Sequence, residues 1–138
     1  MRPAAAKLLL AGLTALALSV PTSGLAVEPP VGMPLDCTGS GPFVAHPKSF
    51  AFSCDGHIVF TNARWTDWGA PVAHGTSILW LGTSCTPNCA QAPRKRYVAK
   101  LTASNIVYCH ERQRIYGTVV ARFAGYRLVG APPVCSAT

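Results

Sequence analysis

Hydrophobic and polar residues alternate along much of the chain with the two-residue period of a β-strand. In residues 96–101, Tyr97 shares an apolar face with the other odd positions, whereas Arg96 and Lys100 lie on the opposite face. This pattern predicts a half-exposed strand whose basic face points outward. The most continuous β-branched run, residues 115–123, predicts the central strand of the sheet.

Turn signals between the apolar runs predict short strands joined by tight connections. Residues 49–54 alternate aromatic and small side chains and lead into Asp55 and Gly56, a dipeptide suited to a hairpin turn. Residues 57–60 are then expected to return antiparallel to the first strand. Residues 75–81 predict a further strand.

The tryptophans and the lack of a helical repeat define the fold class. Trp65 and Trp68 cannot both lie on one face of a regular strand, so we expect a bend or bulge between them. These two residues and Trp80 are predicted to belong to the core, because an indole ring buries a large area. No apolar repeat of helical period and length occurs between Phe43 and Cys135. The predicted class is all-β: a small, disulfide-stabilised antiparallel β sandwich or barrel of about six strands, without substantial helix.

The beginning of the chain has the parts of an export signal in the usual order. Arg2 and Lys7 give a positive start, an apolar run covers residues 8–20, and small residues precede a cleavage point after Ala26. The run is short for a permanent membrane span, which needs about 20 apolar residues. We therefore predict a signal peptide over residues 1–26 and a secreted, extracellular or cell-envelope protein.

The rest of the chain is predicted to form a single, monomeric β domain. Residues 27–47 are rich in Pro and Gly and are expected to form a tether or wrap, since proline does not fit regular ladders. Residues 48–138 are expected to form the β domain itself. After removal of the signal, ten Lys and Arg remain against five acids, a net charge of +5. This balance favours an anionic or acidic partner.

An even number of cysteines in an exported chain predicts three disulfides. The six residues are Cys37, Cys54, Cys85, Cys89, Cys109 and Cys135. A bridge between the outermost pair, Cys37 and Cys135, would close the two ends of the domain, although the spacing leaves every connectivity open. Cys85 and Cys89 are so close in the sequence that we expect them to find separate partners.

A zinc site is the alternative use of some of these residues. Cys85, Cys89 and Cys109 together with His110 offer three thiolates and an imidazole. We favour disulfides, because an oxidising compartment removes the thiolates that zinc needs. Neither a metal nor a cofactor is therefore predicted.

Three short motifs resemble those of small exported proteins of actinobacteria. They are Cys-Asp-Gly at residues 54–56, Trp-x-x-Trp-Gly at residues 65–69 and Cys-x-Pro-x-Cys-Ala at residues 85–90. The resemblance implies export and a compact β domain of this length. It assigns no catalytic residue to any position.

A small secreted ribonuclease-like hydrolase is one alternative function, because histidines and a carboxylate can act as general bases and acids. His110 and Glu111 lie beside two arginines, and His74 and His57 could meet them through folding. Covalent catalysis is disfavoured, since the Gly-x-Ser-x-Gly motif is absent and oxidised cysteines are not nucleophiles.

A protease inhibitor is a further alternative. The loop of residues 85–89 could present Thr86 and Asn88 to a protease cleft at little ordering cost.

The densest positive charge lies in Arg94, Lys95 and Arg96, followed by Tyr97 and Lys100. A basic loop beside an exposed aromatic ring suits an anionic polymer, because charge contacts add and the ring can stack. We therefore predict a non-catalytic extracellular or cell-envelope protein that binds an anionic envelope polymer or an acidic protein through these five residues.

Overall fold

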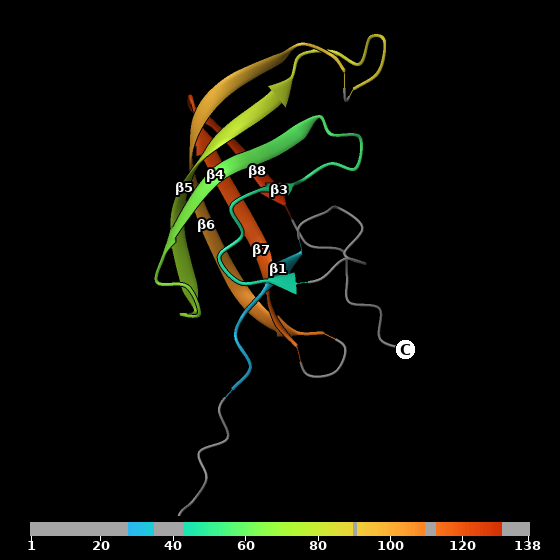
Figure 1. Cartoon of the computed structure of the whole chain (residues 1–138). Coiled ribbons are helices and arrows are strands. Elements are labelled where there is room, and N and C mark those ends of the chain that lie inside the picture. The colour runs from blue at the N-terminus through green and yellow to red at the C-terminus, as the bar shows by residue number, and fades with distance from the viewer. Residues whose placement is uncertain (1–27, 35–42, 90, 110–112, 131–138) are drawn as a thin grey trace, which may run out of the picture.

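The computed structural model describes residues 28–34, 43–89, 91–109 and 113–130 of the 138-residue chain. These residues form two antiparallel sheets. In the small sheet, β1 (Met33–Pro34) pairs with β2 (Phe43–Val44). The large sheet contains β3 (Phe50–Ala51), β4 (Ile58–Thr66), β5 (Val72–Gly82), β6 (Arg94–Tyr108), β7 (Arg114–Phe123) and β8 (Tyr126–Gly130). Each strand of the large sheet pairs with the next one in the sequence, so its topology is a meander (Figure 1).

The predicted all-β class is confirmed, and the described residues contain no helix. Antiparallel strands of this length twist, and the six-stranded sheet curls so that one face is concave and the other convex (Figure 1). In the described part of the chain, no helix is long and apolar enough to span a membrane.

The concave face of the sheet carries the hydrophobic core. Alternate residues of each strand point into it, among them Phe60 of β4, Leu79 of β5 and Leu101 of β6, each 2% exposed or less. Phe50 of β3 stacks on Phe60 with the ring centroids 4.7 Å apart. The intervening positions of the same strands point to the convex face, where no second layer of described residues covers them.

The described residues of the Pro/Gly-rich segment are packed inside the curl. Val31 and Met33 are only 2% and 3% exposed. The Gly32 N–H donates to the carbonyl of Arg114 at 2.8 Å, and the Trp68 indole donates to the carbonyl of Val31 at 2.7 Å. Over these residues the predicted tether is a wrap that completes the core.

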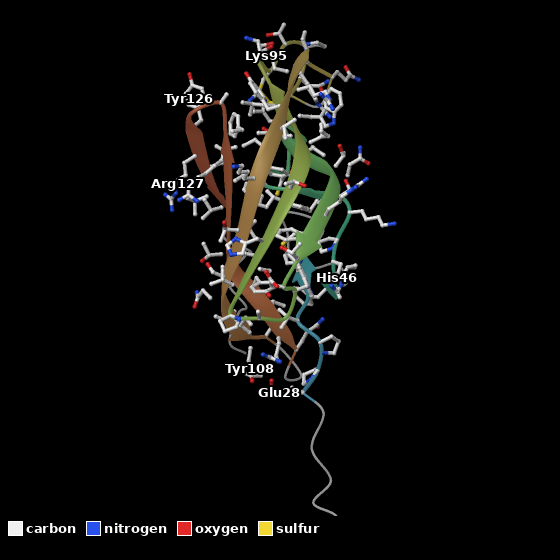
Figure 2. The ribbon with its side chains drawn as sticks, turned by 90° about the vertical axis from the view of Figure 1, so that its left-hand side faces the viewer. Glu28, His46, Lys95, Tyr108, Tyr126 and Arg127 are labelled. Atoms are coloured by element: carbon white, nitrogen blue, oxygen red, sulfur yellow. A yellow bond between two sulfur atoms is a disulfide. The ribbon has the colours of Figure 1, made fainter. Side chains whose placement is uncertain are left out.

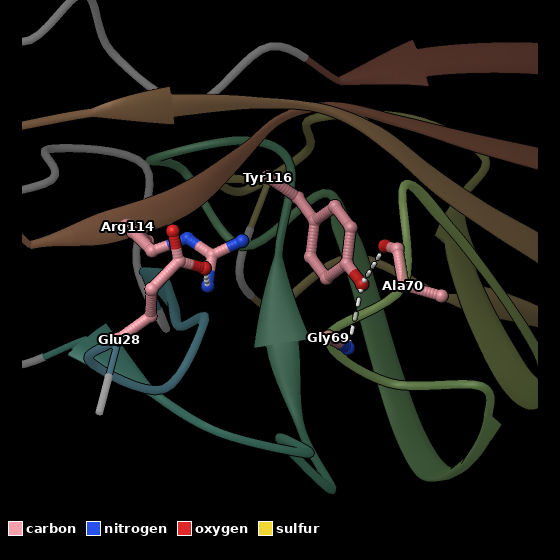
Figure 3. A network of polar contacts seen from close by, with 5 residues as sticks. All are labelled: Glu28, Gly69, Ala70, Arg114 and Tyr116. Carbon is pink, nitrogen blue, oxygen red and sulfur yellow. Dashed lines mark hydrogen bonds and ion pairs between the residues drawn. The ribbon is translucent and has the colours of Figure 1, made fainter. Parts of the chain in front are cut away.

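A buried tyrosine fastens the turn between β4 and β5. The Tyr116 hydroxyl donates to the Ala70 carbonyl and accepts the Gly69 N–H, both at 2.8 Å (Figure 3). Burial raises the pKa of this hydroxyl above its ordinary value of 10.0. On the same strand, Arg114 forms an ion pair with Glu28 at 2.6 Å. These contacts connect β7 to two segments that are distant in the sequence.

The prediction that residues 115–123 form the central strand is wrong. β7 lies next to the edge strand β8, and β5 and β6 occupy the middle of the sheet. The apolar character of β7 has another cause: the wrap covers it, with a parallel bridge from Gly32 to Ile115. Continuous hydrophobicity therefore reports burial on both faces and not the position in the sheet.

The predicted hairpin and the predicted bend are both present. Phe50 pairs with Phe60 across the hairpin of residues 49–60. In the turn after β4, Asp67 and Gly69 have φ angles of 56° and 92°, a conformation that reverses the chain.

Trp65 and Trp68 pack against the core as expected. The prediction is wrong for Trp80, which opposes the exposed Arg96 and therefore points to the convex face, where its indole donates to the Thr61 hydroxyl.

The expectation that Cys85 and Cys89 find separate partners is also wrong, since they form a disulfide with each other. The connection between β5 and β6 reverses so sharply that the two Cα atoms are 3.9 Å apart. Spacing in the sequence alone does not reveal such a reversal. The expected bridge between Cys37 and Cys135 involves residues outside the described ranges.

Candidate functional site

A β-bulge in β4 determines where its arginine points. Thr61 pairs with Ile78 of β5 and Arg64 pairs with Thr76, so β4 holds one residue more than β5 in this interval. Strict alternation from the core residue Phe60 would direct Arg64 into the core. The extra residue moves the Arg64 side chain to the convex face.

A row of cations crosses the convex face of the sheet. Directly opposed residues on β4 to β8 are Arg64, Thr76, Lys100, Arg122 and Arg127. Opposed residues point to the same side of a sheet, and neighbouring strands lie about 4.8 Å apart. The four cations of the row are all exposed, and Arg127 projects from the β8 edge (Figure 2).

Two shallow hollows lie along this row, with volumes of about 680 Å³ and about 390 Å³. Six cations line them: Lys48, Arg64 and Arg96 the larger one, and Lys100, Arg122 and Arg127 the smaller one. We call these six residues the basic face, the larger depression the bulge hollow and the smaller one the hairpin hollow. Val98, which is 66% exposed, lines both hollows and separates them.

No acidic residue lines either hollow. In the part of the chain that the structure describes, the ion pair of Arg114 with Glu28 does not involve the basic face. Asp55 lies in the turn before β4, where a hydrogen bond from the His57 N–H lowers the pKa of its carboxyl. Asp67 lies in the turn after β4. The positive charges of the basic face are therefore not compensated by the acids that the structure describes.

The predicted binding segment begins a strand and is not a loop, which corrects the expectation of a basic loop. Because side chains alternate along β6, Arg96 joins Lys100 on the convex face, whereas Lys95 and Tyr97 point to the other side. The ring of Tyr97 packs against Phe123 with centroids 5.0 Å apart. Only part of the predicted set thus shares a surface, and the aromatic ring expected beside the cations belongs to the opposite face.

Four members of the basic face were not predicted from the sequence. They are Lys48, Arg64, Arg122 and Arg127, which are scattered along the chain. A search for charge clusters along the sequence cannot find them, because only strand pairing brings them together. Alternation along β7 and β8 is a signal for Arg122 and Arg127 alone, because Lys48 precedes β3 and the bulge reverses the alternation at Arg64.

The histidines proposed for a hydrolase do not converge within the described residues. His74 is exposed in β5, where it pairs with Thr66 at the end of β4. His57 precedes the other end of β4, so the two histidines are separated by the length of that strand, roughly 25–30 Å. His110 and Glu111 lie outside the described ranges.

His57 instead lies beside the short disulfide. Its Nδ1 atom is 3.9 Å from the Sγ atom of Cys85, and the ligand atoms of His57, Cys85 and Cys89 all lie within 4.8 Å of one another. Both cysteines are oxidised, and Cys54 and Cys109 are disulfide-bonded as well. In this state none of them supplies the thiolate that zinc requires.

Comparisons with protein-family models, with curated proteins and with solved structures found no match for this chain. The resemblance to small exported actinobacterial proteins stays a prediction. Function is therefore inferred from the geometry and charge of the basic face.

Proposed function

We propose that the protein is a secreted or cell-envelope factor without catalytic activity, which binds a linear anionic polymer on the basic face of its sheet. The observation that carries this proposal is the row of directly opposed cations from Arg64 through Lys100 and Arg122 to Arg127. The binding surface is assembled from five strands of one chain, so a monomer is sufficient.

The row costs stability in the unbound protein. Like charges directly opposite each other on neighbouring strands are destabilising, and Arg122 has a cation on each side, Lys100 and Arg127. Sequences that keep such an arrangement commonly do so where function requires it. A polyanion relieves the repulsion and releases its own counterions when it binds.

A linear polymer fits the shape of the basic face better than a compact partner does. The row crosses five strands and extends over about 19 Å, farther than a single small anion reaches. Interfaces with proteins usually have a buried aromatic anchor at their centre, whereas the exposed apolar residue between the hollows is Val98. Arginine is also suited to phosphate and carboxylate groups, because its planar fork can donate two hydrogen bonds at once.

The proposal is tested by measuring the affinity of the oxidised protein for linear polyphosphate across a range of salt concentrations. The double variant Lys100→Gln with Arg122→Gln should bind about tenfold more weakly at low salt, at up to roughly 1 kcal/mol per lost contact. Its salt slope should fall by about 1.5, the value for two contacts on a single-stranded polyanion.

The matched control compares Lys95→Gln with the single variant Lys100→Gln, which removes the same charge from the opposite face of β6. The affinity of the control variant Lys95→Gln for polyphosphate should fall about twofold or less, which is the effect of a lower net charge alone. Equal losses of affinity in the two variants would refute a role for the row of cations. Binding would then be explained by nonspecific attraction of the polyanion to the net positive charge.

The same preparation should be assayed for RNA breakdown and for inhibition of proteases. RNA turnover that depends on His110 or Glu111 would favour the hydrolase instead. Inhibition that depends on Thr86 or Asn88 would favour the inhibitor, although the ring of residues 85–89 closes too tightly to offer the extended segment that binds in a protease cleft.

A further inference from the structure

The bulge hollow is a depression that the backbone of β4 creates. Asn62 and Ala63 together oppose the single residue Ser77 of β5, so the two strands separate there. Asn62 has a φ angle of 53°, in the left-handed region that most side chains avoid and asparagine tolerates best after glycine. A residue held in this conformation within a strand often marks a functional position.

Three segments supply cations to the bulge hollow. Lys48 comes from the segment before β3, Arg64 from β4 and Arg96 from β6. The side chains of Asn62 and Thr76 add an amide and a hydroxyl to the lining. Ammonium, guanidinium, amide and hydroxyl groups all donate hydrogen bonds, so the lining is composed mainly of donors.

The hydroxyl of Thr76 lies on the same side of the sheet as these cations. Thr76 is exposed and directly opposes Arg64 and Lys100, and opposed residues point to the same side of a sheet. The neighbouring Ser77 pairs with the buried Ala99, so its hydroxyl points to the core and not into the hollow.

We propose that the bulge hollow binds one phosphoryl group, with Lys48, Arg64 and Arg96 as the charge partners. This inference rests on the proposed function and identifies the polymer as one that carries phosphate. A terminal phosphate bears a charge of about −1.5 to −2 at neutral pH and three acceptor oxygens, which matches three cations and several neutral donors better than a carboxylate does.

The hairpin hollow gives the polymer its direction. It begins on the other side of Val98 and is lined by Lys100, Arg122 and Arg127. A chain whose phosphoryl group is held in the bulge hollow therefore crosses Val98 and continues toward the β8 edge. Free phosphate has the same chemistry as the terminal group, so the two sources must be distinguished by experiment.

Inorganic phosphate and linear polyphosphate are the two probes, each titrated into isotope-labelled, oxidised protein and followed by NMR. Phosphate should shift the backbone amide signals of Asn62, Thr76 and Ser77. The variant Arg64→Gln with Arg96→Gln should weaken phosphate binding about tenfold or more. The variant Arg122→Gln with Arg127→Gln should change it about twofold or less and still weaken binding of polyphosphate.

Thr76→Val keeps the measurement interpretable if an arginine variant folds poorly. Valine has nearly the shape of threonine and suits a strand, so the thermal midpoint should change little. Phosphate binding should nevertheless fall about threefold, the loss of one neutral hydrogen bond from the Thr76 hydroxyl.

The outcomes separate the two proposals. Polyphosphate binding that depends on Arg122 and Arg127, without phosphate-induced shifts at the bulge hollow, would overturn the phosphate pocket and leave the proposed function standing. Phosphate binding at the bulge hollow without any binding of polyphosphate would support the pocket, with free phosphate as its ligand, and overturn the polymer. Unchanged phosphate affinity in both Arg64→Gln with Arg96→Gln and Thr76→Val would also refute the pocket.

Discussion

Replacing Arg122 by glutamine should make the unbound protein more stable. Arg122 lies directly between Lys100 on β6 and Arg127 on β8, and it is exposed. The substitution removes two repulsive cross-strand pairs and buries no new group. Most substitutions destabilise a protein, so a gain at this position is a specific consequence of the row of cations.

The size of the gain follows from the geometry of an antiparallel pair. Directly opposed Cβ atoms lie about 5 Å apart, and such pairs change stability by roughly 0.2–1 kcal/mol each. Long side chains can splay apart and water screens their charges, so the two pairs together should contribute about 0.5–1.5 kcal/mol. For a domain of this size, that corresponds to a rise of roughly 2–6 °C in the thermal midpoint.

The assay is thermal unfolding followed by circular dichroism at two salt concentrations. Between about 20 mM and about 500 mM salt the Debye length falls from about 20 Å to about 4 Å. The stabilisation should therefore be largest at low salt and shrink at high salt. Lys95→Gln is the control, because its opposed residue is the apolar Leu81 of β5, and it should change the midpoint by about 1 °C or less.

Two results would refute this reasoning. If Arg122→Gln lowers the thermal midpoint, then the aliphatic part of the side chain matters more than the charge repulsion. If the midpoint rises equally at both salt concentrations, the gain is not electrostatic. Either result would show that the row of cations does not destabilise the unbound protein. The proposed function would then lose one of its supporting arguments.

Three further substitutions test other parts of the fold, each by chemical denaturation. Tyr116→Phe should cost about 1–3 kcal/mol, because it leaves the Gly69 N–H and the Ala70 carbonyl without the hydroxyl. The raised pKa of Tyr116 means that the unfolded chain loses this proton first, so the free energy of unfolding should fall as the pH rises above 10.0. This loss should be smaller in Tyr116→Phe. An identical pH dependence in the two proteins would contradict the raised pKa of Tyr116. Ala124→Asn should stabilise by about 0.5–1 kcal/mol, since Ala124 has a φ angle of 45° in the turn between β7 and β8; a loss would show that the turn does not strain alanine. Asn62→Val should destabilise by about 1–2 kcal/mol, because a β-branched residue does not tolerate a φ angle of 53°, whereas Asn62→Gly should be nearly neutral if the bulge is the reason.

Local patterns were sufficient to predict most of the strands. Alternation in residues 96–101 correctly separated Arg96 and Lys100 from Tyr97, because the two-residue period depends only on the backbone of one strand. The position of β7 in the sheet could not be predicted in this way. Its burial comes from the wrap, a contact between segments that are distant in the sequence.

The candidate site also depends on contacts between distant segments, which sequence patterns do not show. The charge-dense stretch beginning at Arg94 was visible in the sequence, yet the strand divides its side chains between two faces. Arg64 and Arg127 had no sequence neighbour that marked them as part of a site. The pairing of Cys85 with Cys89 was likewise hidden, because it depends on how sharply the connection between β5 and β6 turns.

The sequence by itself determined the all-β class, the hairpin at Asp55 and Gly56, and the outward position of Arg96 and Lys100 on β6, since each depends on residues close together along the chain. Only the tertiary structure decided which cations stand side by side. Register has a period of two, so a shift of one residue moves a side chain to the other face. One additional residue in the bulge of β4 places Arg64 opposite Thr76 and in line with Lys100, and that single residue joins scattered charges into one surface.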